Sequence, residues 1–502
     1  MHLDEYRQYD ATGLAGLIRN REVSREEVLE AAITAIETYN PKLNAVVRTR
    51  FERARQESRK VTDDTLFGGV PTLSKDLLMG LAGEPLSFGS ASLAHWCPKE
   101  DATLIQRSRS AGLVMVGQTA TPELGLMGIT EPKAFPHPHN PWREGYSPGG
   151  SSGGAAVAVA SGMVPMALGG DGGGSIRIPA SYCGLFGFKP SRGRVPLAPA
   201  HGEVWQGAVI EHALTRSVRD SAALLEHING MAPSGPYPVP HERGYVAALS
   251  SPRKPLRIAV SMGESLSRGL GTRLSPDIIA SMNKAATALT DIGHQVEWCE
   301  PPVDGEALAN SYLTLYLGQL AADLVWISQQ TGVAVRRLAI EPSTRAIGRL
   351  GAVLSARDYE LAKRYWHTAA EQMSRFHQRY DAVVMPVAAD TAPKIGELYP
   401  SATRERLMSL LALPGASSLA LKAGLLQRLA VDALRRTPFT QLANLTGQPA
   451  MSVPLHIANN GLPVGVQVLG RMGEDQRLFQ LAAALEQHDV WQRPLPRQAF
   501  CA

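Results

Sequence analysis

The chain contains few cysteines and no long apolar run. Its four cysteines (Cys97, Cys183, Cys299 and Cys501) are far apart and form no CxxC pair, which argues against a zinc ribbon or a disulfide framework. No stretch of 18 apolar residues occurs, and the start MHLDEYRQYD lacks the basic and then apolar pattern of a signal peptide. We therefore expect a cytoplasmic protein that has no membrane span and no secretory leader.

Charge of one sign is not concentrated anywhere in the chain. The 50 Lys and Arg residues and 46 Asp and Glu residues give a net charge of +4, with no block of five like charges. This pattern does not indicate a nucleic-acid partner. The 44% hydrophobic content is typical of a globular enzyme. A length of 502 residues allows about three domains, but no linker divides the chain, so one large domain with an excursion is equally consistent.

Alternating helix and strand patterns indicate an α/β fold. Ser24 and Glu27 form a capping box at the start of an amphipathic helix over residues 24–39. Short β-branched runs bounded by Gly or Pro predict buried strands at 113–117, 255–260, 381–387 and 463–470. Because helical patterns fall between these runs, we expect a large, mostly parallel or mixed β-sheet sandwiched between helices.

Two turns rich in glycine and serine point to the chemistry. The first, GGSSGG at 149–154, precedes the helix-forming stretch AAVAVASG, and the second is GGGS at 172–175. Glycine costs conformational entropy, so such runs indicate backbone that approaches a ligand or adopts positive φ. Consecutive amides around a serine are what an oxyanion hole requires, which makes Ser175 the better candidate nucleophile.

A serine hydroxyl needs a base at neutral pH, and no histidine lies near either turn. Lys75, in the apolar segment GVPTLSKD, is the candidate base, because burial would lower its pKa from about 10.4 towards neutral.

Each feature alone has an ordinary interpretation. A single lysine is most often a solvated side chain, and GGSSGG is also consistent with a flexible turn or a phosphate cradle, although it lacks the P-loop lysine. Residues 149–153 also fit the GxSxG nucleophile elbow, with Ser151 as the nucleophile. The preceding NPWREGYSPGG is loop-like, whereas an elbow follows a buried strand.

Four ordered motifs carry a resemblance to a known family. They are GVPTLSKD, GGSSGG, DGGGSIRIP and CGLFGFKP, with Lys75 and Ser151 separated by 76 residues and Ser151 and Ser175 by 24. In these motifs the chain resembles the amidase signature family, which implies the amidase signature α/β fold. The resemblance covers roughly two thirds of the chain.

The resemblance implies a single amidase domain over residues 1–502. Its signature core would occupy about 65–230 and 436–495, with a variable, substrate-shaping section at about 231–435.

The resemblance also implies a Ser-Ser-Lys triad. Ser175 would attack the substrate carbonyl, Ser151 would relay its proton, and neutral Lys75 would act as the base. A cis peptide would precede Ser151. The backbone N–H groups of four residues would form the oxyanion hole, namely Gly172, Gly173, Gly174 and Ser175.

Further residues are expected to support this triad or to shape the substrate pocket. Ser152 would support Lys75 or Ser151, and Asp171 and Arg177 would hold the loop through charge-assisted hydrogen bonds. Pocket-lining roles are expected for three residues, namely Met127, Gly128 and Ile178. Ordinary core packing is an equally good interpretation of Met127, and the apolar Ile178 favours an apolar group near the nucleophile.

The implied function is amidohydrolysis of a C–N bond through a serine acyl-enzyme, with no metal or organic cofactor. Within the family, residues 171–194 are most similar to amidases that open 6-aminohexanoate cyclic dimers and to aryl-amide and carbamate hydrolases. The expected partner is a small apolar, aryl, cyclic or carbamate-type substrate, and any assembly is expected to be a homodimer. Two alternatives remain: the glutamine-hydrolysing subunit of a tRNA-dependent amidotransferase, and a non-catalytic binding protein.

Overall fold

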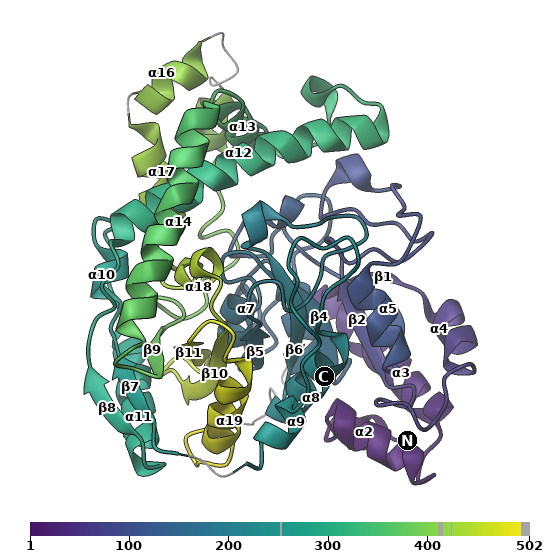
Figure 1. Ribbon diagram of the computed structural model, residues 1–502. Helices are drawn as coiled ribbons and strands as arrows, with labels where there is room; N and C mark the ends of the chain where they lie inside the picture. The colour runs from purple at the N-terminus through teal and green to yellow at the C-terminus, as the bar shows by residue number, and fades with distance from the viewer. Residues whose placement is uncertain (252–253, 410–414, 423, 493–502) are drawn as a thin grey trace.

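A single mixed β-sheet organises the chain. The computed structural model describes residues 1–251, 254–409, 415–422 and 424–492. Within these residues, eleven strands form one sheet that runs from β1 at the right of Figure 1 to β8 at the left. In their order across the sheet the strands are β1 (Val46–Thr49), β3 (Val114–Thr119), β2 (Pro71–Lys75), β4 (Met166–Asp171), β6 (Ile210–Thr215), β5 (Phe186–Lys189), β10 (Ala450–Ile457), β11 (Pro463–Gly470), β9 (Ala382–Pro386), β7 (Arg257–Val260) and β8 (Gln295–Trp298).

Helices cover both faces of this sheet, as β9 illustrates. Side chains alternate between the two faces of a strand. Val383 and Met385 of β9 belong to the core cluster formed with α12 (Gly305–Thr331), α14 (Ala356–Phe376) and α18 (Gln441–Thr446). Ala382 and Val384 belong to the cluster that includes α11 (Pro276–Asp291) and α19 (Asp475–Glu486). The expected sandwich of helices around a large mixed sheet is confirmed.

The remaining helices complete these layers. In the first half of the chain they are α1 (Leu3–Tyr6), α2 (Ala11–Arg19), α3 (Arg25–Leu43), α4 (Phe51–Ser58), α5 (Thr103–Ser110), α6 (Gly153–Ala160), α7 (Arg177–Cys183), α8 (Val218–Ile228) and α9 (Tyr245–Ala248). In the second half they are α10 (Glu264–Ser267), α13 (Pro342–Ala352), α15 (Ala402–Ser409), α16 (Ala416–Lys422) and α17 (Leu425–Leu434). Among the described residues, no helix combines the length and apolarity needed to cross a membrane.

Local sequence signals locate several elements correctly. Ser24 caps α3 through the Glu27 amide, and the Glu27 side chain accepts from the Ser24 backbone, so the predicted capping box is present. The helix continues to Leu43, beyond the predicted end at residue 39. The predicted strand at 463–470 coincides with β11, and those at 113–117, 255–260 and 381–387 overlap β3, β7 and β9.

The section at 231–435 has two structural roles. It contributes β7, β8 and β9 to the same sheet as the signature motifs. It also forms α12 and α13, which lie at the top of the molecule in Figure 1. Leu320 and Leu324 of α12 pack against Leu86 and Phe88, so this helix rests on the segment that follows β2. Strands from both parts of the chain therefore share one sheet, above which α12 forms a roof.

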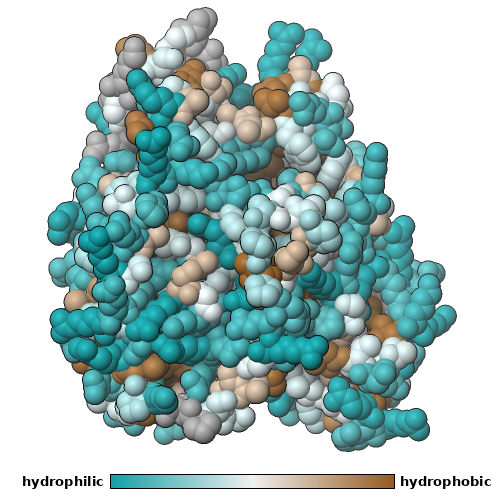
Figure 2. Space-filling model, viewed as in Figure 1, coloured by the Kyte–Doolittle hydropathy of each residue, from teal (hydrophilic) through white to brown (hydrophobic). Residues whose placement is uncertain are grey.

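The face of the molecule in Figure 2 is mostly hydrophilic, and its apolar side chains stand in small, scattered groups. Isolated exposed apolar residues, such as Trp298 and Leu361, are normal on globular proteins.

Candidate active site

Lys75 is buried at the end of a central strand. It is the last residue of β2, which pairs in parallel with both β3 and β4. Only 1% of Lys75 is exposed, and its Nζ donates a hydrogen bond to Ser151 Oγ at 2.7 Å. Burial lowers the pKa of Lys75 to about 7, although the charges of Asp171 and Glu211 oppose this shift. The structure therefore joins two of the predicted triad residues and favours a neutral amine near physiological pH.

The first glycine-rich turn delivers Ser151 to this lysine. The Gly150–Ser151 peptide bond is cis, as expected, and α6 begins two residues later at Gly153. A side chain at Gly150 would be impossible, because its Cβ would lie 2.6 Å from the carbonyl oxygen of Ile129. The turn therefore packs against neighbouring backbone, and Ser151 is only 2% exposed.

The Ser152 hydroxyl contacts Gly170 rather than Lys75 or Ser151, so its expected supporting role stays a prediction. Its Oγ donates to the carbonyl of Gly170 at 3.1 Å and accepts from the Gly170 amide at 3.3 Å. Glycine at position 169 leaves room for this contact, since a Cβ there would lie 3.1 Å from Ser152 Oγ. Ser152 instead holds the first turn against β4.

Ser175 lies in the second turn, between β4 and α7. Its carbonyl accepts a hydrogen bond from the Ser152 amide at 3.2 Å, which ties the two turns together. Ser175 is partly exposed and borders two cavities. A side chain at Gly173 would overlap the hydroxyl of Tyr312, so glycine there allows α12 to approach the turn. Ser151 and Ser175 thus line the same cavity from two turns that the Ser152–Ser175 hydrogen bond joins.

One of the four predicted oxyanion donors is engaged elsewhere. The Gly174 amide donates to Asp171 Oδ1 at 2.8 Å, because the turn curls back over that carboxylate. Among the described residues, the amides of Gly172, Gly173 and Ser175 have no hydrogen-bond partner. The structure therefore engages Gly174 with Asp171 and leaves the other three amides of the Ser175 turn without a partner among the described residues.

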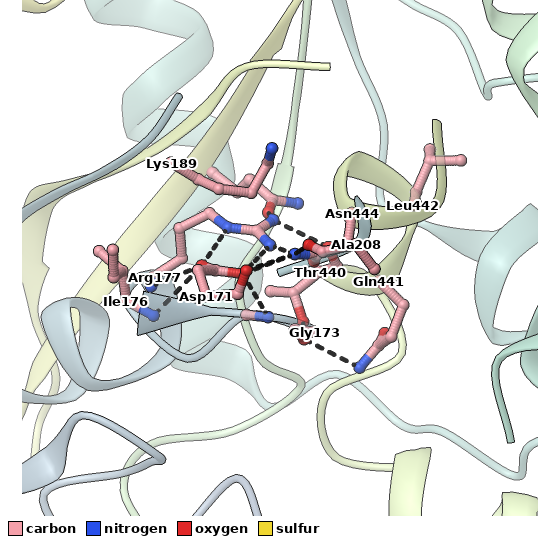
Figure 3. A network of polar contacts seen from close by, with 12 residues as sticks. Asp171, Gly173, Ile176, Arg177, Lys189, Ala208, Thr440, Gln441, Leu442 and Asn444 are labelled. Atoms are coloured by element: carbon pink, nitrogen blue, oxygen red, sulfur yellow. Dashed lines mark hydrogen bonds and ion pairs between the residues drawn. The ribbon is translucent and has the colours of Figure 1, made fainter. Parts of the chain in front are cut away.

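Asp171 and Arg177, which were expected to hold the loop through charge-assisted hydrogen bonds, form a buried ion pair with each other (Figure 3). Arg177 Nε and Nη2 donate to the Asp171 carboxylate at 2.9 and 2.8 Å, and both side chains are fully buried. Burial opposes ionisation of Asp171, but Arg177 and Asn444 lower the pKa of this carboxyl well below its usual range. The amides of Gly174 and Ile176 also donate to it, so the ion pair sets the shape of the nucleophile turn.

A second element closes this network from the C-terminal part of the chain. Arg177 also donates to the Thr440 carbonyl at 2.9 Å and to Asn444 Oδ1 at 2.7 Å. Thr440 Oγ1 and Gln441 Nε2 donate to the Gly173 carbonyl, as Figure 3 shows. The start of α18 therefore fixes the turn from the side opposite β4. These contacts were not predicted from the sequence.

The first cavity contains all the predicted pocket residues. It is about 250 Å³ in volume, and Met127, Gly128, Ile178 and Ser175 line it. Further apolar side chains come from α12 and α13, namely Leu313 and Leu317 of α12 and Ile347 of α13, together with the rings of Tyr312 and Tyr316 of α12. Met127 and Gly128 border the same cavity as Ser175, while their contact with substrate stays a prediction.

The second cavity contains the predicted base and relay. It is about 310 Å³ in volume, and Lys75, Ser151 and Ser175 line it together with the carboxylates of Glu211 and Asp323. Sequence reasoning missed both carboxylates. The carboxylate in the short strand segment IEHALT could have drawn attention to Glu211. Nothing in the sequence of α12 distinguishes Asp323 before its position is known.

The geometry does not fit the nucleophile-elbow alternative. No strand among the described residues directly precedes Ser151, and its Oγ contacts a lysine. The residues that the structure describes also contain no group of three or more His, Cys, Asp or Glu side chains arranged to hold a metal ion.

Comparison with known proteins identifies the family. The Amidase family model matches residues 27–479. The chain is 34% identical over 489 residues to a 6-aminohexanoate-cyclic-dimer hydrolase of Paenarthrobacter ureafaciens, covering 96% of this chain and 95% of that protein.

Solved structures agree with this assignment. A 6-aminohexanoate cyclic dimer hydrolase complexed with substrate superposes with a TM-score of 0.85 at 32% identity, covering 98% of this chain and 99% of the other. A bacterial aryl acylamidase of the amidase signature family gives a TM-score of 0.81 at 25% identity, covering 96% of each chain. The fold and sequence thus define an amide-hydrolysing enzyme. The chain belongs to the amidase signature family, and it is an amidohydrolase of amide C–N bonds.

Proposed function

We propose that this enzyme hydrolyses amides through an acyl-enzyme on Ser175, with Ser151 and Lys75 completing a Ser-Ser-Lys triad. The observation that carries the proposal is the 2.7 Å contact between Lys75 Nζ and Ser151 Oγ, made by two buried side chains beside Ser175. The lowered pKa of Lys75, about 7, supplies a neutral amine that can accept a proton.

The first half-reaction transfers the acyl group to the enzyme. Ser175 Oγ bonds to the carbonyl carbon while its proton passes to Ser151 Oγ, and the Ser151 proton passes to Lys75 Nζ. The amides of Gly172, Gly173 and Ser175 stabilise the negative charge on the carbonyl oxygen. The C–N bond then breaks, the leaving nitrogen takes a proton from Ser151, and Lys75 returns its proton to Ser151.

Water completes the cycle, and its proton follows the same path through Ser151 to Lys75. The water oxygen attacks the Ser175 ester, and the carboxylic acid leaves as Ser175 regains a proton. Asp171 and Arg177 act as positioning residues, because they hold the turn without facing the reacting atoms.

The substrate class follows from the first cavity. Ile178, Met127 and the apolar residues of the roof favour an apolar acyl group over a small polar one. Aryl, cyclic and carbamate-type substrates remain within this proposal. The amidotransferase alternative is less supported, because Ile178 is apolar and the similar proteins described above are named as hydrolases or an acylamidase.

The test is hydrolysis of matched p-nitroanilides, carbamates and cyclic amides by the wild type and by Lys75→Ala, Ser151→Ala and Ser175→Ala. Amide turnover lost in all three variants supports the proposal. Retained turnover by Ser175→Ala would contradict it, and glutaminase activity in the wild type would favour the amidotransferase alternative.

A further inference from the structure

The two cavities that meet at Ser175 differ in charge. The second cavity is lined by three carboxylates, those of Glu203, Glu211 and Asp323. They come from separate parts of the chain: Glu211 from β6, Asp323 from α12, and Glu203 from the loop between β5 and β6. Lys75 also lines this cavity, but the proposed mechanism uses it as a neutral amine. Burial raises the pKa values of Glu211 and Asp323, so these two groups attract a cation only in their ionised forms, which the cation itself would stabilise.

Glu211 is the strongest sign of a ligand. It is only 1% exposed, and among the described residues its Oε1 is buried without a hydrogen-bond partner. The residue lies opposite Gly170 in the β4–β6 ladder and borders the same cavity as Ser151. Burial raises the pKa of Glu211 to about 8, and a cationic group in the cavity would supply the missing partner and favour the ionised carboxylate.

The outer part of the cavity also suits a cation. Asp323 accepts a hydrogen bond from Gln319 Nε2 at 2.9 Å, which fixes its carboxylate on the wall formed by α12. Phe88 and Trp326 line the cavity as well, and their rings stack with centroids 5.7 Å apart. Aromatic faces attract cations through their quadrupoles, particularly beside carboxylates.

The proton path assigns this cavity to one half of the substrate. Ser151 returns a proton to the leaving nitrogen in the proposed mechanism, and Ser151 lines the second cavity but not the first. The amine half should therefore occupy the second cavity. Ile178, which lines only the first cavity, then faces the acyl half.

We propose that the second cavity binds a protonated amino group on the amine half of the substrate, so that the preferred substrates are N-acylated diamines with an apolar acyl group. This inference rests on the proposed function, because the mechanism orients the substrate across Ser175. The cation is bound between Glu211 and Asp323, beside the rings of Phe88 and Trp326.

A matched pair of substrates tests this inference. One is the hexanoyl monoamide of a five-carbon terminal diamine, and the other is the hexanoyl amide of hexylamine, in which a methyl group replaces the ammonium group. We expect the wild-type kcat/KM to favour the ammonium substrate by at least about tenfold, since charge pairs in a partly desolvated site contribute that much. Glu211→Gln and Asp323→Asn should each lower this ratio about tenfold.

Glu360→Gln is the matched control. Glu360 is exposed on α14 and pairs only loosely with Arg364, at 3.8 Å. Removing its charge should leave the substrate ratio unchanged, so a general effect of net charge would be seen in this variant. Labelling of Ser175 by a fluorophosphonate reports the fraction of folded, active enzyme in every variant.

The outcomes separate the two proposals. A wild-type ratio near one, or equal losses for both substrates in Glu211→Gln and Asp323→Asn, would overturn the cation site while leaving the triad intact. Failure of the wild type to hydrolyse either amide, together with no label on Ser175, would overturn the proposed function itself.

Discussion

The reacting groups and the cavity walls come from two different regions of the chain. Residues 65–230 place Lys75, Ser151 and Ser175 at strand ends and on turns fixed by buried hydrogen bonds. Residues 231–435 contribute α12, whose side chains reach both cavities but make none of the contacts of the proposed proton relay. The reacting groups therefore lie on a strand end and on rigid turns, while a packed helix above them lines the cavities that select the substrate.

The largest effect is expected in the first region. Ser175→Ala and Lys75→Met should each reduce kcat on an apolar amide by roughly 10⁴-fold or more, because residues that act as a unit lose their function together. For the same reason the double variant should be no slower than either single variant. Steady-state kinetics on purified protein measures both effects, and additive losses would argue against a shared proton path.

The next effect separates buried from exposed ion pairs. Arg177→Met leaves the Asp171 carboxylate buried and unpaired, so it should destabilise the fold by about 3–5 kcal/mol. Arg364→Met on the exposed face of α14 is the control and should change stability by less than about 0.5 kcal/mol. Denaturant unfolding monitored by circular dichroism gives both values, and equal losses would remove the special role of the Asp171 network.

The pH dependence tests the state of Lys75. The base must be neutral, and Lys75 is protonated below its pKa of about 7, so kcat/KM should fall about tenfold per pH unit below that value and level off above it. Lys75→Arg keeps a permanent charge and should be inactive across the range. A rising limb near pH 10 would instead mean that burial does not lower the pKa of Lys75.

The smallest effects concern acyl-chain preference and involve both regions. Ile178→Ala should reduce kcat/KM for a hexanoyl amide about tenfold relative to the acetyl amide, because it removes apolar contact in the first cavity. Ile347→Ala, on α13, should lower the same ratio by a few fold. Unchanged ratios in both variants would show that the acyl group lies elsewhere.

Much of the fold could be predicted from the sequence, because its signals are local. The capping box at Ser24 and the short β-branched runs located their elements, and the four motifs identified the family. Asp171 and Arg177 were expected to hold the loop through charge-assisted hydrogen bonds, and the carboxylate accepts such bonds from Arg177 and from the Gly174 amide. These features depend on residues close in sequence or on a sequence pattern that identifies a family and therefore its fold.

The rest depends on long-range packing. Ser152 was expected to support Lys75 or Ser151, and the contact of its hydroxyl with Gly170 was not predicted, because the partner of a buried hydroxyl depends on which backbone lies beside it. The Gly174 amide turns to Asp171 for a similar reason. Glu211 and Asp323 lie on elements 112 residues apart, and only the folded chain brings them to one cavity.

The most direct test of Ser175 as the nucleophile is to map by mass spectrometry where a fluorophosphonate binds covalently. The proteins compared are the wild type, Ser175→Ala, Ser151→Ala and Lys75→Met. We predict one adduct, on Ser175, absent in Ser175→Ala and formed much more slowly in the other two variants. An adduct on Ser151, with Ser175→Ala still active, would contradict the role of Ser175 as the nucleophile.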